Sequence, residues 1–168
     1  MSAPSLSETL GPPPFRFEPR PARIRAAAFS RFFRLLATGL VAAIGTWMHS
    51  LWAAGKLAPA GASNAMALGW PLAAFAVVAI TWWFIQTSKT TLTPEALHQS
   101  WMWDKKMELH ELAYAKLIRV RGLEWLIAPR LYVRTLLGKF AVFYTADKAM
   151  LEEFERLVVE LKSFRNFR

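Results

Sequence analysis

The sequence predicts a membrane protein of the α + β class: a two-helix transmembrane hairpin, then a small β domain closed by an amphipathic C-terminal helix. Three observations predict this fold, namely two long uncharged apolar segments, strand-like alternation after residue 88, and a helical apolar stripe near the C-terminus. The composition agrees, because 54% of the 168 residues are hydrophobic while the formal net charge is +9. Apolar and basic residues must therefore occupy different segments.

The first 31 residues are rich in proline and arginine. Prolines recur from Pro4 to Pro21 with little apolar periodicity, and this composition predicts a flexible cytoplasmic tail over residues 1–31. A cleavable signal peptide is not expected, because the first long apolar run begins near Phe32 and is long enough to span a bilayer.

Residues 32–87 predict the transmembrane hairpin. Residues 35–54 and 66–86 contain no formally charged side chain. About 20 helical residues cover about 30 Å, which is the thickness of the hydrocarbon core of a bilayer. The link, residues 55–65, is short and rich in small residues. The alternative is a pair of buried helices in a soluble bundle. Such helices normally carry a polar stripe, and neither segment has one, so the alternative is disfavoured.

The distribution of basic residues predicts the orientation of the hairpin. Six arginines precede the first span, the link carries only Lys56, and lysines resume with Lys89 after the second span. By the positive-inside rule, both termini lie in the cytoplasm and the link lies outside. The predicted location is therefore the cytoplasmic (inner) membrane.

After Ser88, apolar and polar residues alternate as they do in half-buried strands. Turn-forming pairs such as Arg121–Gly122 and Gly138–Lys139 separate the alternating runs. We expect a cytoplasmic domain over residues 88–168. Its predicted strands, about seven, lie near residues 90–93, 96–103, 106–110, 115–121, 124–127, 130–137 and 139–145.

The C-terminal segment predicts an amphipathic helix that covers the sheet. Its helically spaced apolar residues are Met150, Leu151, Phe154, Leu157, Val158, Leu161 and Phe164. Thr145 or Asp147 can cap its start, and Glu152 can pair with Arg156 one turn later. The acids expected on its solvent face are Glu152, Glu153, Glu155 and Glu160.

Seven short strands closed by one helix, over residues 89–164, resemble the pleckstrin-homology (PH) superfold. Because they follow a two-helix hairpin directly, the arrangement is similar to that of bacterial membrane proteins with PH-like domains. The resemblance lies in element order, with residues 116–122 and 138–144 where such domains carry strands, and not in a signature motif. It implies a PH-like β-barrel or sandwich but no functional residues. A small unrelated β-barrel with a terminal helix is the alternative.

His49 is an ionisable residue inside a predicted span, and such residues suggest a function. Gly45 lies one turn earlier, so a flat macrocycle could approach the backbone and take the imidazole as a ligand to haem or chlorophyll. The simpler interpretation is that His49, between Trp47 and Trp52 near the outer end, meets interfacial water. Apart from this hypothesis, no cofactor is predicted.

His98 and His110 raise the question of a metal site with Glu108 or Glu111. A two-residue turn at Asp104–Lys105 would place His98 opposite Glu111. His110 would then lie on the other face of the sheet. The sequence therefore predicts a cross-strand His98–Glu111 pair and no shared metal.

Two kinds of residue are predicted to contact a partner or lipid. Trp101 and Trp103 lie on one face of a predicted strand, where they are exposed anchors or, in a shifted register, core residues. The strand region also carries more Lys and Arg than Asp and Glu, which suits an anionic membrane surface. The basic candidates are Arg119, Arg121, Arg130 and Arg134.

Motifs of several enzyme classes are missing: the chain has no cysteine, no Gly-rich phosphate loop, no Gly-x-Ser-x-Gly elbow and no HExxH. The leading hypothesis is a non-enzymatic membrane protein whose cytoplasmic domain binds a protein partner, or its own copies, to organise a membrane complex. The alternatives are a module that binds anionic lipids and a cofactor-binding subunit that uses His49. Nucleic acid is not an expected partner, because the basic residues also serve topology and no binding motif is present.

Overall fold

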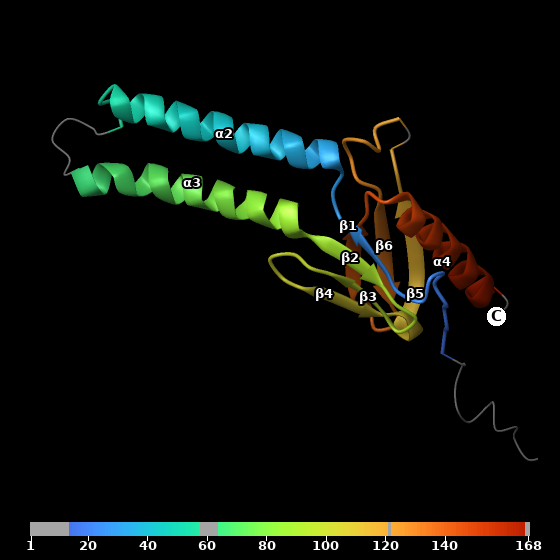
Figure 1. The fold of residues 1–168 in the computed structure, drawn as a ribbon. Coiled ribbons are helices and arrows are strands. Elements are labelled where there is room, and N and C mark those ends of the chain that lie inside the picture. The colour runs from blue at the N-terminus through green and yellow to red at the C-terminus, as the bar shows by residue number, and fades with distance from the viewer. Residues whose placement is uncertain (1–13, 58–63, 121, 167–168) are drawn as a thin grey trace, which may run out of the picture.

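The computed structural model describes residues 14–57, 64–120 and 122–166. Two long helices form a hairpin that extends from one side of a β domain (Figure 1). We define the β domain as residues 14–30 and 88–166; its described residues form two antiparallel sheets, a short 3-10 helix and one α-helix. The coarse prediction of two apolar helices followed by strands and a C-terminal helix is confirmed.

The hairpin consists of α2 (Arg31–Ala53) and α3 (Asn64–Thr87). Ser30 is the N-cap of α2, since its Oγ accepts a hydrogen bond from Phe33 N at 3.1 Å. Both helices are long and apolar enough to cross a membrane. Of the residues of α2, only Ala37 is buried within the chain.

Polar side chains join the two helices near the β domain. Thr38 Oγ1 accepts hydrogen bonds from Trp82 Nε1 at 2.9 Å and from Gln86 Nε2 at 3.1 Å. Gln86 Nε2 also donates to the Arg34 carbonyl at 3.0 Å. These bonds fix how the helices are aligned at the end of the hairpin that meets the β domain.

The first sheet, sheet A, contains the strands β1 (Ile24–Ala27), β2 (Lys89–Leu92), β3 (Ala96–Gln99) and β4 (Lys105–Glu108) in that order. β1 pairs antiparallel with β2, from Ile24 opposite Leu92 to Ala27 opposite Lys89. The helical hairpin is therefore inserted between two neighbouring strands of one sheet. As a consequence, the chain must leave and re-enter the β domain on the same side of any membrane that the hairpin crosses.

The prediction of a flexible tail over residues 1–31 is wrong for the part that the structure describes. Phe15 and Phe17 are 3% and 1% exposed and belong to the hydrophobic core. The Arg156 guanidinium covers the Phe17 ring at 4.7 Å from its centroid. The predicted domain boundary at residue 88 is wrong for the same reason, because β1 and these rings complete the β domain. Residues 1–13 lie outside the described residues.

The second sheet, sheet B, contains β5 (Leu112–Ile118), β6 (Arg130–Thr135) and β7 (Phe140–Tyr144), and the 3-10 helix η1 (Leu109–Glu111) leads into it from β4. The two sheets share one core, to which Leu92 of sheet A and Leu131 and Phe143 of sheet B contribute. Buried Gln99 also joins the sheets, because its Oε1 accepts a hydrogen bond from Tyr144 N at 3.1 Å.

The seven observed strands are not the seven predicted ones. The predicted strand 96–103 ends at Gln99, and residues 100–104 form a loop before β4. The predicted strand 124–127 consists of turns and bends. β1 lies in the segment that was predicted to be a tail. Because it takes the place of the missing strand 124–127, the number of strands in the described residues is still seven. The other predicted strands match observed ones to within three residues at each end, which is the usual uncertainty of such boundaries.

The amphipathic helix α4 (Lys148–Asn166) covers the core at the open side of β5, as the sequence predicts (Figure 1). Four of the predicted apolar positions are almost completely buried: Met150, Phe154, Leu157 and Leu161. Asp147 caps the helix, since its Oδ1 accepts a hydrogen bond from Met150 N at 3.1 Å.

Two predictions for side chains of α4 are wrong. Glu153 is 8% exposed instead of facing solvent, because Arg156 Nη1 reaches its Oε1 at 2.8 Å. The partners of Arg156 are Glu153 and Glu160, not Glu152. Arg156 also donates to the carbonyl of Glu18, so its guanidinium ties the N-terminal segment to α4.

Candidate functional site

Sheet B turns one face to the core and the other away from it. The side chains on this second face, which we call the outer face, are half-buried or exposed. They are Tyr114, Lys116 and Ile118 of β5, Arg130, Tyr132 and Arg134 of β6, and Phe140, Val142 and Tyr144 of β7. None of these nine residues is acidic, so the face combines positive charge with aromatic surface.

Pairing across the three strands brings the aromatic rings together. Tyr114 lies opposite Arg134, which lies opposite Phe140. The Tyr132 ring stacks on Phe140 with centroids 6.3 Å apart and meets Tyr114 edge-on at 6.4 Å. Phe140 is 70% exposed and Tyr114 is 50% exposed. Cations and flat apolar rings are thus presented side by side on a rigid sheet.

The structure separates the four predicted basic contact residues. Arg130 and Arg134 both lie on the outer face, on either side of Tyr132. Arg119 follows β5 and is paired instead with Glu155 of α4, with Nη1 and Oε1 2.5 Å apart. Arg121 lies outside the described residues. The aromatic members of the outer face were missed, because in β7 both alternating sets are apolar and alternation alone cannot tell which is buried.

The prediction that Trp101 and Trp103 share a strand face is wrong, because β3 ends before them. The Trp101 ring packs against Phe29 at 5.5 Å and against Phe84 of α3 at 6.1 Å between centroids. Trp103 is 73% exposed in the same loop. Trp101 therefore packs where the hairpin meets the β domain, whereas the Trp103 side chain is exposed.

His49 lies on an exposed part of α2, with its ring 5.8 Å from that of Trp52. An open apolar pocket of about 370 Å³ lies beside it, lined also by Gly45 and Phe75. A Cβ added to Gly45 would lie 3.5 Å from the Phe75 ring. The Cβ position of Gly45 is therefore in van der Waals contact with the Phe75 ring of α3, while Gly45 also lines the pocket beside His49.

The predicted His98–Glu111 pair is wrong. The register places His98 opposite Lys106, because the loop between β3 and β4 has five residues and not two. His98 Nε2 lies 3.6 Å from Asp104 Oδ2 within that loop. The physical reason is that β3 stops at Gln99, whose side chain turns inward to bind sheet B.

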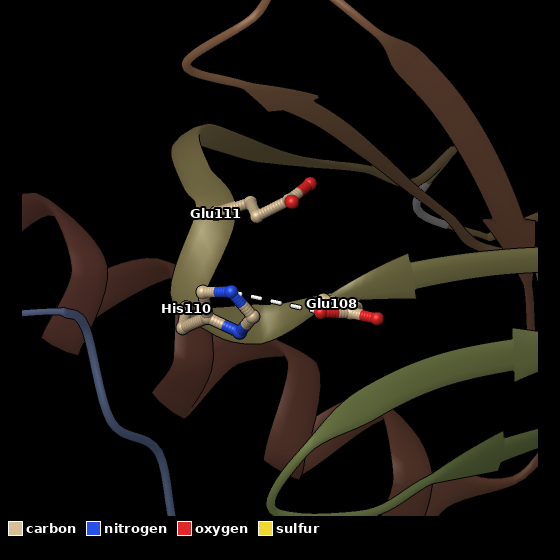
Figure 2. A group of neighbouring side chains, drawn as sticks. All are labelled: Glu108, His110 and Glu111. Carbon is tan, nitrogen blue, oxygen red and sulfur yellow. Dashed lines mark ion pairs between the residues drawn. The ribbon is translucent and has the colours of Figure 1, made fainter.

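Glu108, His110 and Glu111 instead come together at the end of β4 and in η1 (Figure 2). Their potential ligand atoms lie within 4.8 Å of one another. Glu108 already has two nitrogen neighbours, with Lys106 Nζ at 3.5 Å and His110 Nε2 at 3.6 Å. His110 is exposed and the two glutamates are half-buried, so the group has the character of a surface ion-pair network more than of a preformed metal site.

No protein-family model, curated protein or solved structure matches the chain.

Proposed function

We propose that this chain is an integral membrane protein whose two helices cross a bilayer and hold the β domain at the cytoplasmic surface. The exposed apolar surface of the hairpin supports membrane insertion, since Leu35 is 70% and Trp70 84% exposed on helices that are long and apolar enough to span a bilayer. The excess of arginine before α2 and the single Lys56 in the link support the cytoplasmic orientation.

We further propose that the β domain is PH-like. A meander of four strands, a meander of three strands and a C-terminal helix follow one another in the order expected for that superfold. In this interpretation the membrane hairpin occupies the connection between the first two strands. The proposal would fail if an experimental structure showed a different strand order.

The function that we propose is non-enzymatic: the β domain binds a protein partner, or a second copy of the chain, and so organises a complex at the membrane. One observation carries this proposal, the outer face of sheet B with its exposed Phe140 and Tyr114 beside Arg134. Aromatic residues and arginine are enriched at protein interfaces. A complementary partner would offer carboxylates to the guanidinium groups and apolar side chains to the rings.

Affinity purification of the full-length chain in mild detergent tests this proposal. Arg134→Glu and Phe140→Ala should each lose a stoichiometric partner or the self-association of the wild type. Lys162→Glu and Val159→Ala are matched controls, because they make the same types of change on the exposed side of α4. Equal recovery by all four variants, or no associated protein and no self-association in the wild type, would contradict the proposal.

Binding of anionic lipid is the second candidate, favoured by the absence of acids among the nine outer-face residues. It predicts that a version of the β domain with the hairpin replaced by a short linker binds anionic vesicles, and that salt weakens this binding strongly. Arg134→Glu should reduce it. Under the protein-partner proposal this soluble version stays in the supernatant when the vesicles are sedimented.

A further inference from the structure

Two loops of the β domain lie against the ends of the hairpin. Residues 100–104, between β3 and β4, extend back alongside the end of α3 (Figure 1), where the Trp101 ring meets Phe84. Ser100 is anchored next to the helix end, since its N donates to the Lys89 carbonyl at 2.9 Å. This loop is thus held at the level of the last turn of α3.

The second loop lies between β5 and β6, and its described residues 122–129 lie against the start of α2. The Trp125 ring meets Phe32 edge-on at 4.6 Å. Ser30, the N-cap of α2, donates from its Oγ to the Trp125 carbonyl at 2.6 Å. The Ser30 side chain therefore both caps α2 and holds the second loop against it by a hydrogen bond.

Both loops present apolar side chains that the protein leaves uncovered. In the first loop Met102 is 41% and Trp103 73% exposed; in the second, Leu123 is 41% and Trp125 52% exposed. Basic residues flank the same end of the hairpin, and they are Arg31 and Arg34 of α2 and Lys89 at the start of β2. Tryptophan together with lysine and arginine is the composition of the membrane–water interface.

We infer that these two loops enter the lipid headgroup layer on either side of the hairpin and hold the β domain in one orientation against the membrane. This inference rests on the membrane insertion proposed above. Lipid is the expected occupant because the loops touch the first turn of α2 and the last turn of α3, where a spanning hairpin meets the headgroups. A domain fixed in this way keeps its outer face in a constant position relative to the bilayer.

The chain has no cysteine, so single cysteines can report the depth of each loop. Met102→Cys and Leu123→Cys are placed in the full-length chain, labelled with an environment-sensitive fluorophore and reconstituted into vesicles with quencher-bearing lipids. Leu137→Cys is the matched control, because Leu137 is 81% exposed in the turn between β6 and β7 at the far end of sheet B. Val77→Cys, on an exposed side of α3, reports insertion of the hairpin itself.

We expect quenching and a blue-shifted emission at positions 102 and 123, approaching the values at 77, with neither effect at 137. Quenching at 77 but not at 102 and 123 would overturn the inference and leave the membrane insertion intact. Equal quenching at 137 would also overturn it, because the domain would then have no fixed orientation. An unquenched label at 77 would overturn both proposals.

Discussion

The hairpin and the β domain use the same apolar residue types in opposite ways. In the hairpin Leu35 and Trp70 are 70% and 84% exposed, whereas in the β domain Leu131 and Leu157 are completely buried. The β domain can therefore be stabilised by its own core, but the hairpin must gain its stability from a surrounding apolar phase. The two regions nevertheless depend on each other in sequence, because the hairpin interrupts the β domain between β1 and β2.

The largest effect that we predict concerns which segments of the chain the β domain needs in order to fold without the hairpin. A fragment of residues 88–168 should not fold, because it lacks β1 and the rings of Phe15 and Phe17. Joining residue 28 to residue 88 by a short Gly-Ser linker should restore a soluble folded domain, since Ala28 N donates to the Ser88 carbonyl at 3.2 Å. Dispersion of amide signals in an NMR spectrum distinguishes the outcomes. A well-folded 88–168 fragment would show that the N-terminal segment is dispensable.

The next effect concerns the core contribution of the N-terminal segment. Phe17→Ala should lower the free energy of unfolding of the β domain by about 3–5 kcal/mol, because it removes a fully buried ring. Phe32→Ala, in the exposed first turn of α2, is the control for loss of a phenyl ring and should cost far less. Thermal unfolding of the full chain in mild detergent measures both. Similar losses of stability for Phe17→Ala and Phe32→Ala would contradict the view that the β domain is stabilised by its own core and the hairpin is not.

A smaller effect is expected from loss of the hydrogen bond between Gln99 of sheet A and Tyr144 of sheet B. Gln99→Leu keeps the volume but leaves the Tyr144 N–H without its acceptor, which should cost about 1–3 kcal/mol. His98→Ala, at the neighbouring position on the outside of sheet A, should stay within about 0.5 kcal/mol of the wild type. Denaturant unfolding of the linker-joined domain measures the difference. An unchanged midpoint for Gln99→Leu would rule out this bond as a stabilising feature.

The smallest effect lies within the hairpin. Thr38→Val removes the acceptor of the Trp82 and Gln86 hydrogen bonds with little change in shape, and such interhelical bonds contribute about 0.6–2 kcal/mol. Thr46→Val is a suitable control, because among the described residues the Thr46 hydroxyl donates to the Ala43 carbonyl within α2 and bonds to no other helix. We expect a lower melting temperature in detergent for the first variant than for the second. The reverse order would contradict the observed alignment of the helices.

The helices were predictable from sequence because their signals are long and local. Two uncharged segments and one apolar stripe each extend over several turns, so single exceptions such as Pro71 do not obscure them. β1 was not predicted, since its partner lies beyond the hairpin and no local pattern records that pairing. Phe15 and Phe17 do alternate with polar residues, but the surrounding prolines gave the segment the composition of a tail.

The candidate site was only partly predictable for a related reason. Arg130 and Arg134 were expected to contact a partner and do share the outer face, because both lie on one strand with even spacing. The rings beside them come from neighbouring strands, and their positions depend on register. That register is set within sheet B, where the pairing of β5 with β6 shifts between Leu112 and Tyr114 and residues 136–139 join β6 to β7.

The most direct test of the account is the membrane sidedness of single cysteines in intact cells. Arg25→Cys precedes the hairpin, Lys56→Cys lies in its link and Lys139→Cys follows it. A membrane-impermeant maleimide should modify position 56 in intact cells and positions 25 and 139 only after lysis. Modification of 25 and 139 from opposite sides, or protection of 56 in intact cells, would contradict a hairpin that crosses the membrane between two strands of one cytoplasmic domain.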